Sequence, residues 1–390
     1  MVRVPMPTPS LPHSGPVYLD CNATTPVEPA VAELVLRFLR EEYGNEGSRT
    51  HGFGARAKQA VQRARDQVAA VVGAQRDEVV FTSGATESNN LAILGLAAFG
   101  EANGRRHVIT TAIEHKAVLE PCDELGRRGF EVTLLPVGAG GRVDPEAVAA
   151  AVRPDTLLVS VMQVNNETGV CQPIAEIAGV LAGHPSYFHT DAAQGFGKDL
   201  EPLRDPRIDL ISLSGHKLMA PKGIGALVTR RRGYDRPPLR PLVFGGGQER
   251  GLRPGTLPVA LIVGLGLAAE MAAKEHAARA ARCRAIKQEA LAALLPLGAL
   301  QNGDPAQVMD HVLNLSFRGL DSEALMVALK DLVAVSNGSA CTSSSYTPSH
   351  VLKAMGRTDE EANEAVRFSW CHLTPDVPWA KVAARVTGLR

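Results

Sequence analysis

The stretch that decides the expected fold is residues 208–230, "IDLISLSGHKLMAPKGIGALVTR". Two continuous apolar runs, 208–214 and 225–230, flank a loop that is rich in glycine and contains a proline. Apolar runs that are continuous rather than alternating are typical of strands buried on both faces of a sheet. Gly215, His216 and Lys217 follow the first run, so the pattern predicts polar side chains just after the end of a buried strand.

Five more runs of the same kind precede this stretch, and Ala/Leu-rich helical segments separate them. The runs are "EVVFTS" at 78–83, "HVITTA" at 107–112, "FEVTLLPV" at 130–137, "TLLVSVMQV" at 156–164 and "SYFHTD" at 186–191. Strands that alternate with helices predict an α/β fold with a parallel sheet. Such a sheet binds its ligands at the carboxyl ends of its strands, so the residues just after each run are the candidates for a site.

A second and smaller α+β set follows a long helical segment at 258–296. Its expected elements are "VLNLSF", "ALMVALKD", "LVAVSN" and "AVRFSW". The segment 258–296 is expected to bridge two lobes, with the boundary near residue 275. The proline-containing opening, "MVRVPMPTPSLPHSG", is predicted to be a disordered leader.

Composition excludes several classes of protein. Lys plus Arg equals Asp plus Glu at 41 each, so no net field attracts the chain to nucleic acid or to an anionic membrane. The longest apolar run, 259–269, is about half of the roughly 20 residues that a membrane span needs. Six scattered cysteines without metal-ligand spacing argue against a disulfide framework and a metal site, and we expect a cytoplasmic protein. The basic segment 230–240, "RRRGYDRPPLR", is expected to be a loop, either solvated or an electrostatic docking patch.

Lys217 stands out because the chain has only ten lysines against 31 arginines. A desolvated lysine can lose its proton and form a Schiff base, which arginine cannot. "HTDAAQ" places Asp191 and Gln194 at the end of another expected strand. Pyridoxal phosphate needs both a lysine and a carboxylate, as Lys217 and Asp191 would supply. The carboxylate keeps the ring nitrogen protonated, and the lysine holds the aldehyde carbon.

Three more strand ends carry polar groups. "SGATESNN" runs from a strand through Gly84, Ala85 and Thr86 into a helix, which is a turn suited to an anion such as phosphate but also an ordinary strand-to-helix turn. "IEHKAV" adds His115, which either acts on a bound ring or is a hydrogen-bonded core histidine. "VNNETG" adds Asn166, whose amide could bond a ring oxygen.

At this point the chain resembles the cysteine desulfurases, which belong to the class V aminotransferase group of fold-type I pyridoxal-phosphate enzymes. The resemblance covers about residues 18 to 370. Ten blocks in the family's order carry it: "YLDCNATTPV", "GSRTHGFG", "VFTSGATESNNLAI", "EHKAVL", "VNNETGV", "HTDAAQ", "SGHKLMAPKGIGAL", "GGGQERGLRPGTLPV", "NGSACTSSSYTPSHVL" and "VRFS". It implies a large domain with a mostly parallel seven-stranded sheet over 28–275. A smaller α+β domain would be formed by 18–27 with 276–390, after a leader at 1–17.

The resemblance also implies a role for each matching residue. Lys217 would form the Schiff base, Asp191 would pair with the pyridine nitrogen, and His115 would stack on the ring. The phenolic oxygen would be approached by Asn166 and Gln194, and Asn166 would also contact substrate. Residues implied in phosphate binding are Ala85, Thr86, Ser214, His216 and, from the second subunit of a homodimer, Thr256. Arg367 would grip the substrate carboxylate, a task that suits its planar fork of donors.

Cys341 lies within "NGSACTSSS", where small residues give low side-chain bulk and a free backbone. In a cysteine desulfurase this thiol would take sulfur from L-cysteine, leave L-alanine, and carry the persulfide to an acceptor protein. The extended loop resembles the mobile-loop branch, whose members serve iron–sulfur cluster assembly, tRNA thiolation or DNA phosphorothioation. Two alternatives stay open: another class V aminotransferase or lyase, and a non-catalytic scaffold of a sulfur-transfer complex.

The segment "FSWCHLTP" departs from the family pattern after Arg367. Cys371 and His372 are unusual at these positions. They indicate either a packed strand with an incidental thiol, or a second sulfur acceptor or metal ligand.

Overall fold

The computed structural model describes residues 15–338 and 348–389. The chain divides into two compact units. Of the described residues, the larger unit contains 25–166 and 171–276, and the smaller contains 15–24, 167–170, 277–338 and 348–389. The expected boundaries at 27/28 and 275/276 thus lie at 24/25 and 276/277, and the short segment 167–170 had no signal in the sequence. Val17 belongs to a strand, so the predicted leader does not extend to residue 17.

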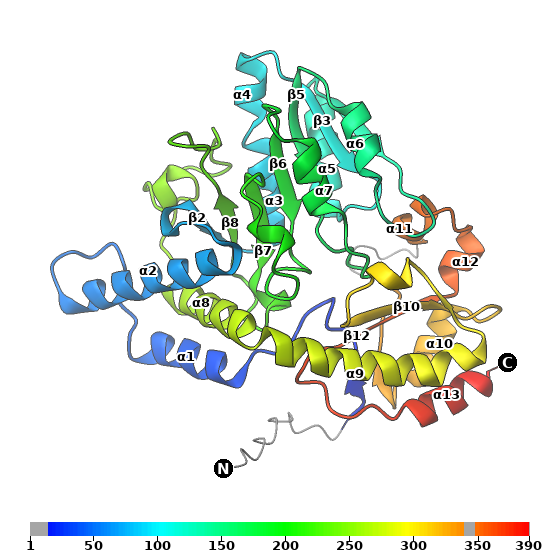
Figure 1. Cartoon of the computed structure of the whole chain (residues 1–390). Coiled ribbons are helices and arrows are strands. Elements are labelled where there is room, and N and C mark those ends of the chain that lie inside the picture. The colour runs from blue at the N-terminus through cyan, green and yellow to red at the C-terminus, as the bar shows by residue number, and fades with distance from the viewer. Residues whose placement is uncertain (1–14, 339–347, 390) are drawn as a thin grey trace, which may run out of the picture. The chain divides into compact units, whose positions relative to one another are not determined.

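The larger unit contains the seven predicted strands in one sheet (Figure 1). They are β2 (Val79–Thr82), β3 (His107–Thr111), β4 (Glu131–Leu135), β5 (Thr156–Ser160), β6 (Tyr187–Asp191), β7 (Leu210–Ser214) and β8 (Gly225–Thr229). Their order is β2-β8-β7-β6-β5-β3-β4. Only β8 runs antiparallel to its neighbours, so the other six strands end at the same edge of the sheet. The predicted α/β class and mostly parallel sheet are confirmed.

Helices cover both faces of this sheet. They are α1 (Pro29–Arg40), α2 (Gly52–Val72), α3 (Ala85–Leu94), α4 (Ala97–Ala102), α5 (Lys116–Arg127), α6 (Pro145–Ala151), α7 (Ile174–Val180) and α8 (Val259–Lys274). Phe81 and Val228 pack with α1, α2 and α6–α8 in one apolar cluster. Val80 and Leu227 point the other way and pack with α3–α5 in a second cluster. Successive side chains of each strand therefore enter opposite cores, which is why the apolar runs are continuous.

The smaller unit contains two short sheets. Parallel strands β1 (Val17–Tyr18) and β11 (Val333–Ala334) form one, and antiparallel strands β9 (Leu300–Gln301), β10 (Val312–Ser316) and β12 (Ala365–Ser369) form the other. Its helices are α9 (His276–Leu294), α10 (Ser322–Leu329), α11 (His350–Ala354), α12 (Asp359–Asn363) and α13 (Trp379–Thr387). The expected single helix over 258–296 is two helices, because α8 ends at Lys274 and α9 begins at His276.

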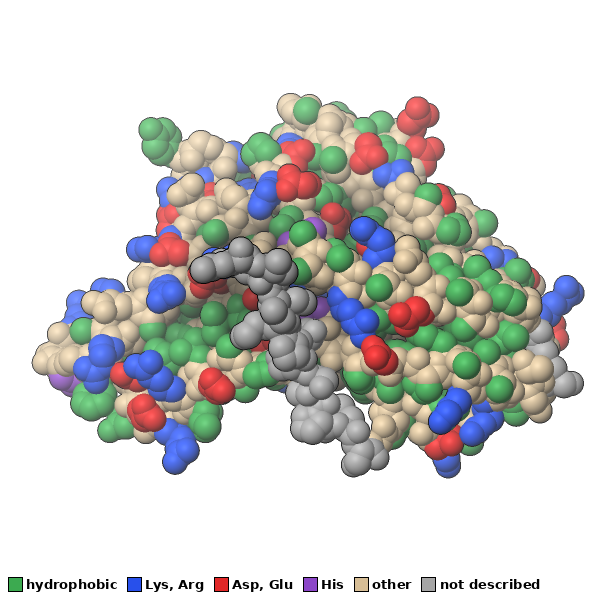
Figure 2. All heavy atoms as spheres, turned by 60° about the horizontal axis from the view of Figure 1, so that its bottom comes forward, with side chains coloured by type: hydrophobic (Ala, Val, Ile, Leu, Met, Phe, Trp, Pro, Cys, Tyr) green, Lys and Arg blue, Asp and Glu red, His purple; other side chains and the backbone are tan. Residues whose placement is uncertain are grey.

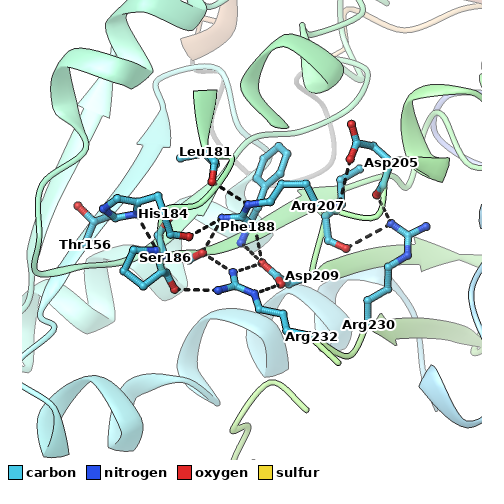
Figure 3. A network of polar contacts seen from close by, with 12 residues as sticks. Thr156, Leu181, His184, Ser186, Phe188, Asp205, Arg207, Asp209, Arg230 and Arg232 are labelled. Atoms are coloured by element: carbon cyan, nitrogen blue, oxygen red, sulfur yellow. Dashed lines mark hydrogen bonds and ion pairs between the residues drawn. The ribbon is translucent and has the colours of Figure 1, made fainter. Parts of the chain in front are cut away.

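An arginine network joins the amino ends of β6 and β7 in the larger unit (Figure 3). The buried carboxylate of Asp209 accepts hydrogen bonds from Arg207 (2.8 Å), from Arg232 (2.7 and 2.8 Å) and from the N–H of Phe188 (2.7 Å). Arg230 donates to the carbonyls of Leu203 and Ile208. The segment 230–240 is a loop, as expected, and residues 232–236 in it are exposed. Its arginines Arg230 and Arg232 also brace the sheet.

Basic and acidic side chains are interspersed over the face shown in Figure 2, in keeping with equal numbers of the two charges. Among the described residues, no helix combines the length and the apolar character needed to cross a membrane.

Candidate active site

A glycine contact shapes the edge of the sheet where six strands end. Gly225 opens β8 and pairs with Thr82 of β2 on one side and with Ser214 of β7 on the other. A Cβ added at Gly225 would lie 2.6 Å from the Cα of Gly84 and 2.5 Å from the carbonyl oxygen of Leu213. Only glycine allows this approach, so the turn after β2 rests directly on the start of β8.

The helix α3 begins at Ala85 immediately after this turn, with Thr86 exposed in its first turn. Unbonded N–H groups and the helix dipole make such an end attractive to an anion. Glu87 lies in the same turn, but its carboxylate already accepts from the N–H of Ser83 (2.7 Å) and pairs with Arg253 (3.0 Å). Because these partners already compensate the charge of Glu87, the turn remains favourable for an anion.

Asp191 ends β6 and is 5% exposed. Its Oδ2 accepts from Nδ2 of Asn89 (2.7 Å), and its Oδ1 accepts from the N–H of Ala193 (2.9 Å). Two donors that hold one buried carboxylate fix its orientation. Asn89 was missed in the sequence, since it stands in the middle of α3 and only its contact with Asp191 reveals its role.

His216 and Lys217 lie in a single 3₁₀ turn that follows β7. The carbonyl of His216 accepts from the N–H (3.0 Å) and from Oγ1 (2.9 Å) of Thr25, which fixes the turn. Burial, together with the charges of Lys217, Lys222 and Lys198, lowers the pKa of His216 to about 4. His216 is thus a neutral imidazole at neutral pH, within a group of three lysines that favours an anion.

His115 is the N-cap of α5, and its Nδ1 accepts from the N–H of Ala117 (3.1 Å). The residue before it, Glu114, is fully buried and was missed in the sequence. Oε1 of Glu114 accepts from Oγ1 of Thr111 (2.8 Å) and from the N–H of Met162 (2.8 Å), so it ties the ends of β3 and β5 together. Burial raises the pKa of Glu114, the hydrogen bonds from Met162 and Thr111 oppose the increase, and the negative charge of Asp191 adds to it. The resulting pKa is about 8.

The other predicted residues of the larger unit occupy loops. Gln194 is buried just after β6, and Asn166 is half-buried in the loop after β5. Thr256 is exposed in the loop before α8. Parallel strand ends thus bring Asp191, Gln194 and the 214–217 turn to one edge of the sheet, as the sequence predicts.

Arg367 belongs to the smaller unit, where it stands in β12 and is 2% exposed. Its Nη2 donates to Oδ1 of Asp20 (2.6 Å) and to Oγ of Ser336 (3.2 Å). Ser336 also exchanges backbone hydrogen bonds with Arg367. The guanidinium is therefore held by side chains from two segments that are distant in sequence.

Cys341 lies outside the described residues, but both flanks of its segment are described. Ser349 donates from Oγ to Oε2 of Glu167 (2.5 Å), and the side chain of Glu167 also packs against Gly338. Burial raises the pKa of Glu167, while the hydrogen bond from Ser349 and the charges of His350 and Arg367 oppose the increase. The sequence pattern gives no indication of these contacts of Glu167.

The departure at "FSWCHLTP" forms a packed segment. Trp370 is 1% exposed, and its Nε1 donates to the carbonyl of Cys283 (3.0 Å). Cys371 is 4% exposed, and a hydrogen bond from Cys21 together with the charge of His372 lowers its pKa to about 6 despite burial. Within the described residues, no group of three or more His, Cys, Asp and Glu side chains could hold a metal. β12 ends at Ser369, and residues 370–374 continue as a turn in which only His372 is not buried.

Comparison with known proteins identifies the architecture. The family model "Aminotransferase class-V" matches residues 17–376. The chain belongs to the class-V aminotransferase family. It is 52% identical over 355 residues to cysteine desulfurase IscS of Methylococcus capsulatus, covering 91% of this chain and 87% of that protein. The crystal structure of DndA from Streptomyces lividans is 54% identical with a TM-score of 0.80, and the match covers 91% of this chain and 99% of that one.

A third relative is a solved complex with cysteine. The structure "SspA in complex with cysteine" is 39% identical with a TM-score of 0.79, and the match covers 90% of this chain and 98% of that one. The predicted resemblance of this class-V chain to cysteine desulfurases and its fold-type I architecture are therefore confirmed.

Proposed function

We propose that this protein is a cysteine desulfurase, which converts L-cysteine into L-alanine and keeps the sulfur as a persulfide on Cys341. Three features lie at one edge of the sheet: Lys217, the carboxylate of Asp191 with its two hydrogen-bond donors, and the anion-binding turn. This arrangement carries the proposal. Class V membership supports a pyridoxal 5′-phosphate enzyme.

The residues at this edge fit that cofactor. Its phosphate would be held by the N–H groups of Ala85 and Thr86, by the Ser214 hydroxyl and by the neutral His216, with Thr256 of a second subunit completing the set. Gly84 in this turn and Gly225, which packs against it, both lack a Cβ, so no side chain of these two residues blocks the turn. Asp191, oriented by Asn89 and Ala193, would face the ring nitrogen. When bound, pyridoxal phosphate supplies an electron sink for the carbanion formed at the substrate Cα.

Lys217 and His115 would move the protons. Lys217 would anchor the cofactor, then as a free amine accept the Cα proton of L-cysteine. Because Nδ1 of His115 accepts from Ala117, the neutral ring carries its proton on Nε2. That nitrogen would deliver a proton toward the alanine product, while Asn166 and Gln194 would approach the phenolic oxygen of the cofactor.

The sulfur step belongs to the smaller unit. Arg367, oriented by Asp20 and Ser336, would bind the substrate carboxylate with its remaining donors. The thiolate of Cys341 would attack the substrate sulfur, so that an S–S bond forms while the substrate C–S bond breaks and its electron pair stays on carbon. Protonation of that carbon gives the methyl group, and return of a proton to Cα, from Lys217, completes L-alanine.

A cysteine assay tests the proposal. The wild type is expected to release alanine and to gain one sulfur atom on the peptide that contains Cys341. Lys217→Ala should lose the visible absorbance of the lysine-bound cofactor together with all turnover, whereas Cys341→Ser should keep the absorbance and form no persulfide. Release of sulfide by Cys341→Ser at the native rate would refute the assignment of the nucleophile.

The same assay separates the alternatives. Another class V aminotransferase or lyase would give a keto acid instead of alanine, and it would have no use for Cys341. A non-catalytic scaffold would show no turnover and no cofactor absorbance.

We also propose a homodimer that passes its sulfur to an acceptor protein in the cytoplasm, without contacting nucleic acid directly. All five cysteines among the described residues are free thiols, as a reducing compartment favours. Iron–sulfur cluster assembly, tRNA thiolation and DNA phosphorothioation are the candidate destinations. Capture of the persulfidated protein with its acceptor would decide among them.

A further inference from the structure

Two hydrogen bonds of opposite direction join the loop after β3 to the loop after β5. Oε1 of Glu114, in the first loop, accepts from the N–H of Met162 in the second (2.8 Å). Nδ2 of Asn165, in the second loop, donates to the carbonyl of Ile113 in the first (3.0 Å). All four residues are buried, so no water is at hand to replace a lost partner. These two hydrogen bonds form what we call the loop clasp.

Each half of the loop clasp adjoins a residue that is proposed to contact the cofactor. Glu114 precedes His115, whose ring nitrogen caps α5. Asn165 precedes Asn166. A shift between the two loops would therefore move the imidazole expected to stack on the cofactor ring away from its place relative to the amide expected at the phenolic oxygen.

The loop clasp is anchored to the sheet on both sides. Oγ1 of Thr111, the last residue of β3, donates to the same Oε1 of Glu114 (2.8 Å). In the loop after β5, the N–H of Gln163 donates to the carbonyl of Asp191 at the end of β6 (2.9 Å). Because β5 lies between β3 and β6 in the sheet, the loop clasp connects three neighbouring strand ends.

Strand pairing does not supply this connection. The pairing of β3 with β5 ends at Thr110 and Ser160, before either loop begins. Beyond that point the two printed side-chain contacts of Glu114 and Asn165 hold the loops together.

We infer that Glu114 and Asn165 are positioning residues for the cofactor ring, because the loop clasp sets the places of His115, Asn166 and Asp191 relative to one another. This inference rests on the proposed function. It assigns no chemical step to Glu114 or Asn165, since neither is proposed to touch cofactor or substrate.

Titration of the cofactor-free full chain with pyridoxal phosphate tests the inference on Glu114→Leu and Asn165→Ala. The leucine is similar in size to glutamate but cannot accept a hydrogen bond, and the alanine cannot donate one. Each variant should bind the cofactor about tenfold more weakly, the change expected from one lost buried hydrogen bond.

Two readouts on the loaded protein report the position of the ring itself. The visible circular dichroism of the bound cofactor should differ from that of the wild type, because the groups expected on the face and at the edge of the ring have moved. At saturating cofactor, kcat for alanine formation should fall about tenfold or more, since a small misplacement of reacting groups is costly in rate.

Two further variants separate positioning from general damage. Glu114→Gln keeps an oxygen that can accept from Met162 and Thr111, so it should restore the native affinity, spectrum and rate. Thr156→Val is the matched control, because it deletes a buried hydrogen bond of 2.8 Å between Oγ1 and Nδ1 of His107, at the opposite ends of the same strands β3 and β5. It should lose thermal stability as the loop-clasp variants do, but keep the native affinity and spectrum.

Native affinity and a native spectrum in folded Glu114→Leu and Asn165→Ala would overturn the inference. Equal losses in Thr156→Val would overturn it as well, because they would show a general loosening of the sheet. If Glu114→Leu does not fold, Asn165→Ala decides alone. A wild-type protein that binds no pyridoxal phosphate or makes no alanine from cysteine would instead contradict the proposed function, so the two failures are distinguishable.

Discussion

Replacing Glu114 by glutamine is expected to change how the free energy of unfolding depends on pH. The substitution keeps the shape of the side chain, and the amide oxygen can still accept from Thr111 and from the N–H of Met162. It removes only the ability to titrate. The pH dependence that disappears in the variant therefore belongs to Glu114.

The magnitude follows from the pKa. The carboxyl titrates at its ordinary 4.5 in the unfolded chain and at about 8 in the folded protein. Because the folded state binds the proton more tightly, this stabilisation is fully present below pH 4.5 and is lost as pH rises through 8. Between pH 5 and pH 8 the wild type should lose about 3 kcal/mol through this group.

Urea unfolding at pH 5 and at pH 8 measures the effect. The difference in free energy of unfolding between Glu114→Gln and the wild type should shift by about 3 kcal/mol in favour of the variant at the higher pH. Glu146→Gln, at an exposed position in α6, is the control and should follow the wild type. An equal pH dependence in the wild type and Glu114→Gln would refute the claim that the buried carboxyl is protonated at neutral pH.

Three further substitutions probe the framework of the site. Asp209→Asn should cost about 3 kcal/mol in urea unfolding, because the arginines that face this buried carboxylate lose their counter-charge; a loss below about 0.5 kcal/mol would contradict the bracing role. Gly225→Ala should weaken cofactor binding, measured by dialysis and absorbance, because its Cβ would push against Gly84; unchanged retention would show that the turn can relax. Asn89→Ala should also weaken cofactor binding, since Asp191 loses one of its two donors. Asn89→Gln is not expected to restore binding, because the longer side chain has no room in a fully buried site.

The sequence alone determined the strands of the large sheet and the residues at their ends. Continuous apolar runs predict strands buried on both faces, and parallel strands place Asp191 and Lys217 at one edge whatever the details of packing. The boundaries were less well predicted. A helix expected to be continuous ends at Lys274 and restarts at His276, and the segment 167–170 lies in the smaller unit.

Only the tertiary structure revealed the residues that act through others. Asn89, Glu114 and Glu167 lie within the motif blocks, but the motifs do not show what these side chains contact. They pair with Asp191, Met162 and Ser349, which are 102, 48 and 182 residues away in sequence. A hydrogen bond between distant segments leaves no periodic or local trace, because the pattern of a segment reflects its own burial and conformation. The residues proposed to touch substrate or cofactor could be assigned from motifs shared with a family. The residues that orient them could be assigned only from the contacts that the fold makes between distant segments.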